Sequence, residues 1–187
     1  MKGEKNRKDL NLFDKSLTID EDIEIAETYK KTENMNNTVI IKDNYEQIVG
    51  FSLGNEFFGI DILNVEEIIK PIEPTYVPNT KKYLIGIINL RGKIIPIVDL
   101  HLKFELDKGY IGPESRVIIV ATKKCNVGFL IDKVDRVYYI DKKSIEPTPA
   151  NVPQNLEKYI KGVGKLDSGI ITLLNVNEIL KDNVALS

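Results

Sequence analysis

From residue 47 onward, apolar and polar positions alternate along much of the chain. Residues 49–53 and 58–62 each place an apolar side chain at every second position, and Gly54-Asn55-Glu56 lies between them. A period of two is typical of a β-strand that buries one face, because successive side chains point to opposite sides of the sheet. Two such runs joined by a short turn predict a β-hairpin over residues 47–62. Residues 117–132 show the same pattern around a lysine-rich turn and predict a second hairpin.

The second half of the chain repeats the first half. Gly59 matches Gly128 at an offset of 69 residues, and Ile94–Asp99 matches Ile170–Asn175 at an offset of 76. Two copies of about 70 residues, each with four or five short strands, predict an all-β fold of two small barrels, since a closed barrel leaves no exposed strand edge. A four-residue motif between these points also recurs, as Ile72-Glu73-Pro74-Thr75 and as Ile145-Glu146-Pro147-Thr148.

Short helices are predicted at three places in the repeated part. Each copy ends with a residue suited to cap a helix N-terminus, Asp99 or Asn175, so each copy is expected to close with a short helix. Apolar residues in the segment Asp61–Ile69 have helical spacing, with core packing as the default interpretation. Glu66 and Glu67 would then face solvent, and no metal ligand lies near them in the sequence.

Composition supports a β-rich globular protein. The chain has 27 isoleucines and 14 valines, which suit pleated sheets, and 42% of its residues are hydrophobic. A net charge of −2 argues against a dedicated nucleic-acid binder, which needs a surplus of cations. No apolar run approaches the ~18 residues of a membrane span, and no signal peptide is recognisable, so we expect a cytoplasmic protein without membrane insertion.

The inventory of reactive side chains does not favour an enzyme. His101 is the one histidine and Cys125 the one cysteine, so a structural zinc site of about four Cys/His ligands cannot be built. No nucleophile or carboxylate lies at a spacing that would pair with His101, and Cys125 is interpreted as incidental although lysines flank it. Gly162–Lys165 lacks the spacing of a phosphate loop. No metal or cofactor is expected.

A domain boundary is predicted near residue 45. All eight prolines lie between Pro71 and Pro153, and residues 1–44 carry 8 basic and 10 acidic side chains, with the basic ones gathered first. We interpret residues 1–44 as a flexible acidic extension and residues 45–187 as the folded domain. A short helix over about residues 19–31 is an alternative, because Thr18–Glu21 has the spacing of a capping box, and such a segment could fold on a partner.

The two copies differ at the tip of their last hairpin. Copy one has Arg91 followed by Gly92, and copy two has Asp167 at the position of Arg91. The turn itself therefore does not require arginine. Gly92 would allow the backbone to reverse and would project Arg91 from a rigid tip. An arginine beside Leu90 and a strand of isoleucines suits an interface anchor, and a solvated turn residue is the alternative.

The run Gly86-Ile87-Ile88-Asn89-Leu90-Arg91-Gly92-Lys93-Ile94-Ile95-Pro96-Ile97-Val98-Asp99-Leu100 closely resembles the signature of the CheW family of bacterial chemotaxis coupling proteins. Residues 58–62, 65–68, 127–134 and 162–164 resemble it too, so that the likeness covers about residues 45–181. The resemblance implies two intertwined five-stranded SH3-like barrels without catalytic activity. It implies an adaptor that joins the cytoplasmic tips of chemoreceptors to the regulatory domain of a CheA-type histidine kinase.

The resemblance also implies contact residues. The receptor-facing residues would be Val65, Glu67, Ile68, Leu90 and Arg91. The kinase-facing residues would be Gly86, Val127 and Leu130, of which the last two are the weaker assignment. This chain has His101 where the family often has arginine, which puts any family contact at that position in doubt.

Two other classes were weighed against the adaptor. A CheV-type protein would carry a receiver domain after the CheW-like part, and about ten residues beyond Val176 leave no room for one. A stand-alone β-barrel that binds a small ligand or nucleic acid is the alternative from another class. It would need exposed aromatic residues among basic ones on one sheet face, and residues 45–187, with 18 basic and 18 acidic side chains, offer no such patch.

Overall fold

The computed structural model describes residues 44–107, 109, 111–121, 126–150 and 152–181. The predictions made for residues 1–43 and for Cys125 lie outside the described residues. The alternation of buried and exposed positions forms strands as predicted, and both predicted hairpins are present. The same order of five strands and a closing helix occurs twice along the described part of the chain. The first copy holds β1 (Tyr45–Leu53), β2 (Glu56–Asp61), the 3-10 turn η1 (Ile62–Asn64), β3 (Val65–Ile69), β4 (Leu84–Leu90), β5 (Lys93–Asp99) and α3 (Leu100–Phe104).

The second copy repeats the five strands and the closing helix, and differs in its short helical turns. It holds β6 (Arg116–Ala121), β7 (Asn126–Ile131), β8 (Lys133–Asp141), the 3-10 turn η2 (Lys142–Ser144), α4 (Gln154–Glu157), β9 (Ile160–Leu166), β10 (Gly169–Leu174) and α5 (Val176–Lys181). Both predicted caps are confirmed. The Asp99 carboxylate accepts a hydrogen bond from the Leu102 amide at 3.2 Å, and the Asn175 side chain accepts one from the Glu178 amide at 3.3 Å.

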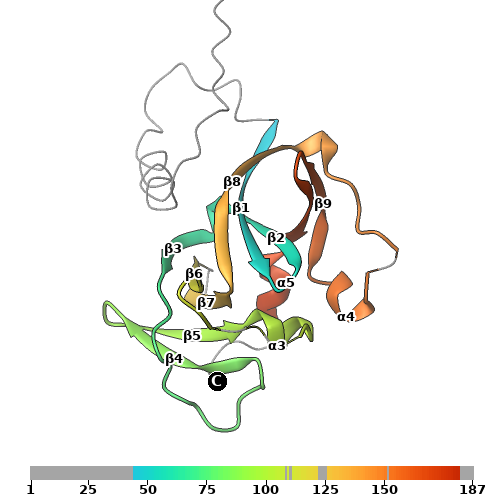
Figure 1. Ribbon diagram of the computed structural model, residues 1–187. Helices are drawn as coiled ribbons and strands as arrows, with labels where there is room; N and C mark the ends of the chain where they lie inside the picture. Colours follow the sequence, from blue (N-terminus) through green and yellow to red (C-terminus); the bar gives the residue numbers. More distant parts are fainter. Residues whose placement is uncertain (1–43, 108, 110, 122–125, 151, 182–187) are drawn as a thin grey trace, which may run out of the picture.

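The two copies exchange their first hairpins. One five-stranded sheet has the order β8-β1-β2-β10-β9 and the other has the order β3-β6-β7-β5-β4, so that each hairpin is inserted among strands of the other copy. The insertions are equivalent, because β2 pairs in parallel with β10 and β7 pairs in parallel with β5. We call the sheets barrel A, with β1 and β2, and barrel B, with β6 and β7. Figure 1 shows barrel A above barrel B, with α3 and α5 where they meet.

Each sheet curls until its two edges meet at a seam. Beyond β3, Thr75 pairs with Ile87 of β4, and beyond β8, Glu146 pairs with Val163 of β9. The backbone comes so close at the barrel B seam that a Cβ on Gly86 would lie 2.4 Å from the Thr75 carbonyl oxygen. Thr75 and Glu146 are thus equivalent, at an offset of 71. The recurring Ile-Glu-Pro-Thr motif aligns the two copies at an offset of 73 residues, which differs by two residues from the alignment that the seams give.

The described residues form three hydrophobic clusters, one inside each barrel and one between the barrels. Barrel B encloses a cluster that includes Ile95, Ile97 and Ile119, and barrel A encloses one that includes Ile48 and Ile171. The largest cluster lies between the barrels, takes residues from both sheets and from α3 and α5, and contains all the buried phenylalanines. Exchange of hairpins and a shared central core make the two barrels one folding unit.

The helical interpretation of residues 61–69 is wrong beyond Asn64. Asp61 caps a single 3-10 turn, and the chain then continues as β3. A register shift between Val65 and Glu67, where β3 pairs with β6, inserts one extra residue. A turn followed by a bulge spaces apolar residues three apart, and this spacing resembles that of a helix.

His101 has the acidic partner that the sequence did not indicate. Its ring is buried on α3, with Nδ1 2.6 Å from the Asp107 carbonyl oxygen and Nε2 2.9 Å from Asp132 Oδ1. Asp132, which lies between β7 and β8, also accepts a hydrogen bond from the Gly54 amide in the β1–β2 turn. With both ring nitrogens engaged in the interior, His101 ties the turns of the two barrels together and has a structural role.

Candidate functional site

The hairpin between β4 and β5 has a tight two-residue turn. Leu90 pairs with Lys93, and the intervening residues are Arg91, with φ of 50°, and Gly92, with φ of 83°. Two left-handed residues in succession give the turn the twist that β-hairpins favour. The Asn89 side chain accepts a hydrogen bond from the Gly92 amide at 2.9 Å and holds the turn closed. The reversal of the backbone predicted at Gly92 is confirmed, and the left-handed backbone includes Arg91 itself.

Arg91 reaches across the seam of barrel B to β3. Its Nη2 lies 3.0 Å from Glu67 Oε2, and the arginine side chain is 79% exposed whereas that of the glutamate is 19% exposed. Glu67 stands opposite Ile119 of β6, a member of the cluster inside barrel B, so the Glu67 side chain lies on the interior face. The ion pair therefore covers the end of the barrel and leaves most of the guanidinium accessible to a partner.

A second polar cluster lies at the same end of barrel B. One oxygen of the Glu66 carboxylate, Oε1, is 3.3 Å from Lys93 Nζ. The other oxygen, Oε2, accepts a hydrogen bond from the Asn126 amide nitrogen at 2.5 Å. A single carboxylate thus joins β3 to the first residue of β5 and to the first residue of β7. Glu66 is exposed as predicted, although its carboxylate is paired with groups of other strands, whereas the prediction is wrong for Glu67, whose side chain is 19% exposed.

The five residues that the resemblance assigned to the receptor lie around this end but differ in accessibility. Val65 is buried and Ile68 is half-buried, and both pack on the core between the barrels. Leu90 is half-buried against the cluster inside barrel B. Arg91 is therefore the member of the predicted set that offers most of its side chain to a partner.

The three residues assigned to the kinase lie inside the fold. Val127 and Leu130 on β7 are 1% and 7% exposed, so their side chains support the core and present little surface. Gly86 has φ of 147° and lies beneath the Thr75 carbonyl oxygen, so that its role is to let the seam of barrel B close. These positions can affect a partner through the shape of the barrel, and we do not assign them direct contacts.

Ile94 is a surface residue of this site that the prediction missed. It follows Lys93 on β5, is 52% exposed, and alternates with the buried Ile95. No local pattern marks it, because residues 94–98 are apolar throughout. Ile95 and Ile97 join the cluster inside barrel B, so Ile94 lies on the opposite face of the strand. Ile170 holds the equivalent position of barrel A and is also exposed. An apolar side chain beside two cations suits a protein interface.

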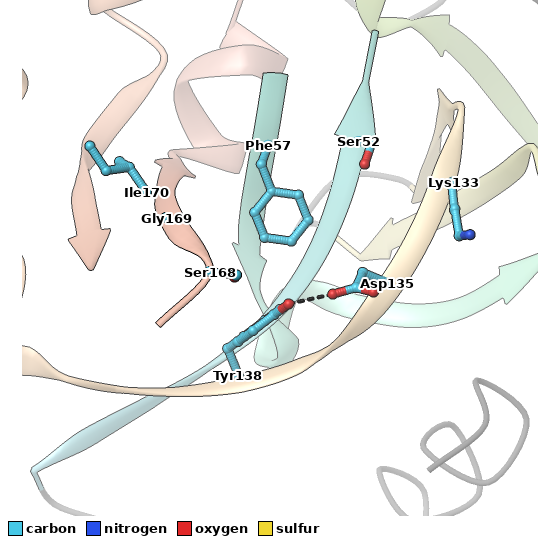
Figure 2. A pocket seen from close by; sticks show the side chains of 8 residues that line it. All are labelled: Ser52, Phe57, Lys133, Asp135, Tyr138, Ser168, Gly169 and Ile170. Carbon is cyan, nitrogen blue, oxygen red and sulfur yellow. Dashed lines mark hydrogen bonds between the residues drawn. The ribbon is translucent and has the colours of Figure 1, made fainter. Parts of the chain in front are cut away.

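The corresponding end of barrel A is open. A pocket of about 360 Å³ lies there, lined by Ser52, Phe57, Lys133, Asp135, Tyr138, Ser168, Gly169 and Ile170. Figure 2 shows the Tyr138 hydroxyl directed to Asp135, to which it donates a hydrogen bond, with the Phe57 ring beside it. Burial, followed by this hydrogen bond, raises the pKa of Tyr138. A hydrogen bond to Glu114 is the main cause of the raised pKa of Lys133.

Within the described residues, no cluster of three or more histidine, cysteine, aspartate or glutamate side chains could hold a metal ion. None of the helices in the described ranges has the length and apolar character needed to cross a bilayer. Gly162–Lys165, weighed as a weak phosphate-loop signal, lies in β9 and forms part of the sheet.

Comparison with known proteins gives consistent matches. A family model described as CheW-like domain matches residues 47–184. The chemotaxis protein CheW of Helicobacter pylori is 38% identical over 142 residues, which cover 75% of this chain and 86% of that protein. CheW of Klebsiella aerogenes is 35% identical over 150 residues, which cover 76% and 90%. The crystal structure of the scaffolding protein TtCheW from Thermoanaerobacter tengcongensis matches with a TM-score of 0.70 and 35% identity, over 79% of this chain and 96% of that chain.

Proposed function

The chain belongs to the CheW family of chemotaxis proteins, whose members are scaffolds rather than enzymes, and we propose that it joins chemoreceptors to a CheA-type histidine kinase. The proposed partners are the cytoplasmic tips of the receptors and the regulatory domain of the kinase. The chain would then work in the cytoplasm, recruited to receptor arrays at the membrane. Neither a cofactor nor nucleic acid is part of this function.

The observation that carries the receptor assignment is the exposure of Arg91 on a tip of fixed geometry. A two-residue turn held by Asn89 fixes the backbone that carries Arg91, so this part of the chain has little freedom to lose on binding. The Glu67 carboxylate orients the guanidinium, and Ile94 supplies exposed apolar area on the outer face of the same hairpin. An arginine beside apolar surface is a common energetic centre of a protein interface. Helix carboxylates or helix carbonyl groups of the receptor tip are the acceptors that would suit it.

The kinase assignment is supported by the fold rather than by particular side chains. The family resemblance gives the kinase regulatory domain the same two-barrel architecture. Gly86, which the resemblance links to kinase coupling, closes the seam of barrel B in this chain. We propose that kinase coupling depends on the shape of this barrel, and that Val127 and Leu130 contribute as core residues of it.

Arg91→Ala tests the receptor assignment. Loss of a hydrogen bond to a charged group costs roughly 1.5–3 kcal/mol, so the affinity for a purified receptor cytoplasmic fragment should fall by about 10- to 100-fold. The melting temperature should change little, because the arginine is mostly exposed. Asp167→Ala, at the equivalent tip of barrel A, is the matched control and should bind normally. An unchanged affinity of Arg91→Ala with a large drop in melting temperature would assign the arginine a structural role instead.

Glu67→Lys distinguishes the two partners. The substitution places a second cation beside Arg91 at the end of barrel B and should displace the guanidinium from its position. Receptor affinity should therefore fall more than kinase affinity, when both are measured on the same preparation by calorimetry. Equal losses for the two partners, with a melting temperature lowered in parallel, would indicate general misfolding.

A further inference from the structure

Glu66 lies where three strands of barrel B begin, and each of its carboxylate oxygens contacts a different neighbour. Oε1 faces Lys93 Nζ at 3.3 Å, and Oε2 accepts from Asn126 Nδ2 at 2.5 Å. Lys93 opens β5 directly after the tip that carries Arg91. Asn126 opens β7, which belongs to the hairpin that barrel B receives from the second copy. The carboxylate therefore connects the tip of the first copy to a hairpin of the second copy.

Neither contact would hold this arrangement by itself. Lys93 is exposed and Glu66 is partly exposed, so their attraction is screened by water. The hydrogen bond from Asn126 to a charged acceptor is stronger than a neutral one and limits where the carboxylate can lie. A carboxylate held by Asn126 is a fixed partner for Lys93. The two contacts support each other, and loss of either one frees the carboxylate.

Barrel A shows that the arrangement is particular to barrel B. Its equivalents of Glu66, Lys93 and Asn126 are Asp135, Gly169 and Phe57, at offsets of 69, 76 and 69. Asp135 contacts Tyr138 (Figure 2) and Arg136, and both belong to its own strand, β8. Duplication alone thus does not require a carboxylate that bridges strands at this place.

We infer that Glu66 is a positioning residue that couples the Arg91 tip to the β6–β7 hairpin through Lys93 and Asn126. The inference rests on the proposed function in one respect, which is that the tip is the receptor-binding element. Its structural part is independent of any partner. If the coupling exists, a change at Asn126, on the far side of β5 from Arg91, alters the order of the tip.

The test exchanges the two polar groups. Asn126→Asp in the full chain places a second carboxylate next to that of Glu66. Their repulsion should break the hydrogen bond at position 126 and the ion pair between Glu66 and Lys93. Hydrogen exchange of the Gly92 amide, which is bonded to Asn89, should then become several-fold faster. The double variant with Glu66→Gln and Asn126→Asp rebuilds an amide–carboxylate hydrogen bond in the opposite direction and should restore slow exchange. Lys133→Met, a cation removed at the end of barrel A, is the control and should leave the Gly92 amide unchanged.

Receptor affinity is measured on the same variants. The inference predicts a loss of about three- to tenfold for Asn126→Asp and recovery in the double variant, at an unchanged melting temperature. Unaltered Gly92 exchange in Asn126→Asp, or faster exchange that the double variant fails to reverse, would overturn the inference whatever the receptor does. If exchange follows the prediction but Arg91→Ala binds the receptor normally, the coupling stands and the proposed receptor site fails.

Discussion

The ends of the two barrels are built from equivalent residues but differ in what fills them. At the end of barrel B, Arg91 and Lys93 of the hairpin reach Glu67 and Glu66, and charged pairs cover the opening. At the end of barrel A, Ser168 and Gly169 replace Gly92 and Lys93, and a pocket of about 360 Å³ remains. Ile94 is exposed at the end of barrel B, and Ile170 is exposed at the end of barrel A. The duplication preserved the strands and the outward isoleucine and allowed the polar residues to diverge.

This difference separates residues that the fold requires from residues available for function. Positions alike in both copies lie at seams, cores and caps, as Gly86 and Gly162 or Asp99 and Asn175 do. Positions that differ in charge gather at the hairpin tips. A protein with an internal duplication therefore carries its own control, because each substitution can be paired with the equivalent one in the other copy. The predictions below use such pairs where the chain supplies them.

Gly86→Ala and Gly162→Ala compare the two seams and should have the largest effects. A Cβ on Gly86 would lie 2.4 Å from the Thr75 carbonyl oxygen, at a φ of 147° that side chains avoid. A Cβ on Gly162 would lie 2.6 Å from the Glu146 carbonyl oxygen. The free energy of unfolding should fall by about 3–4 kcal/mol for Gly86→Ala, from crowding plus backbone strain, and by about 1–2 kcal/mol for Gly162→Ala. Urea denaturation measures both, and a larger loss at Gly162 would contradict the greater crowding and backbone strain assigned to Gly86.

His101→Ala and Asn177→Ala compare the helices that follow each barrel. His101 is buried between Asp132 and the Asp107 carbonyl, whereas Asn177, at the same position of α5, is exposed. Removal of the imidazole leaves polar groups unpaired in the interior and should lower the free energy of unfolding by about 2–3 kcal/mol. Asn177→Ala should stay within about 0.5 kcal/mol. Equal losses of unfolding free energy in the two variants would mean that the His101–Asp132 pair does not contribute to stability. Receptor and kinase binding of folded His101→Ala should persist.

The fold could be predicted to the level of strands and copies, and not to the level of partners. Alternation along residues 49–53 and 58–62 is a local property, so it identified the hairpin from the sequence. The pairing of Thr172 on β10 with Phe58 on β2 joins residues far apart in the chain, and alternation looks the same whichever strand lies alongside. The exchange of hairpins was therefore implied by resemblance to a family and was not contained in the pattern. The bulge after Val65 gave the apolar residues of a strand the spacing of a helix, and local spacing alone does not separate the two.

The site could be predicted where one residue dominates and not where distant residues meet. Arg91 stood out because Gly92 followed it and because Asp167 replaced it in the other copy. Glu66 and Asn126 are 60 residues apart, and no local spacing connects them. The partner of His101, Asp132, was missed for the same reason, at a separation of 31 residues. Burial of Val127 also depends on the exchange, because β7 lies between β6 and β5 inside barrel B.

Tyr138→Phe tests the open end of barrel A and should have a small, pH-dependent effect. Burial and the hydrogen bond to Asp135 raise the pKa of Tyr138 above its ordinary value of about 10. The unfolded chain then loses this proton first as the pH rises, so the wild-type protein loses stability above about pH 10 relative to the variant. The ring is half-buried, and screening should keep the change below about 1 kcal/mol. Denaturation at pH 8 and pH 11 measures it, and parallel profiles for the two proteins would exclude this linkage.

Deletion of residues 1–40 should have the smallest effect on either barrel end. In the part of the chain that the structure describes, every strand lies between Tyr45 and Leu174, and the residues named at the two barrel ends belong to this range. The segment before residue 45 carries 10 acidic and 8 basic side chains, so that it can act on a partner mainly through long-range electrostatics. Such an influence weakens as salt shortens the screening length to about 8 Å at physiological ionic strength.

The truncated protein should therefore unfold within about 0.5 kcal/mol of the full chain, which is the usual range for changes outside the packed structure. Its affinities for receptor fragment and kinase regulatory domain should differ from those of the full chain at low salt, and the difference should shrink in a salt series. Melting temperature serves as the control for folding. If the truncated chain failed to fold, or lost binding to the same extent at every salt concentration, the segment would be an integral part of a barrel. The domain boundary near residue 45 would then be wrong, and residues before it would have to be included in the comparison of the two barrel ends.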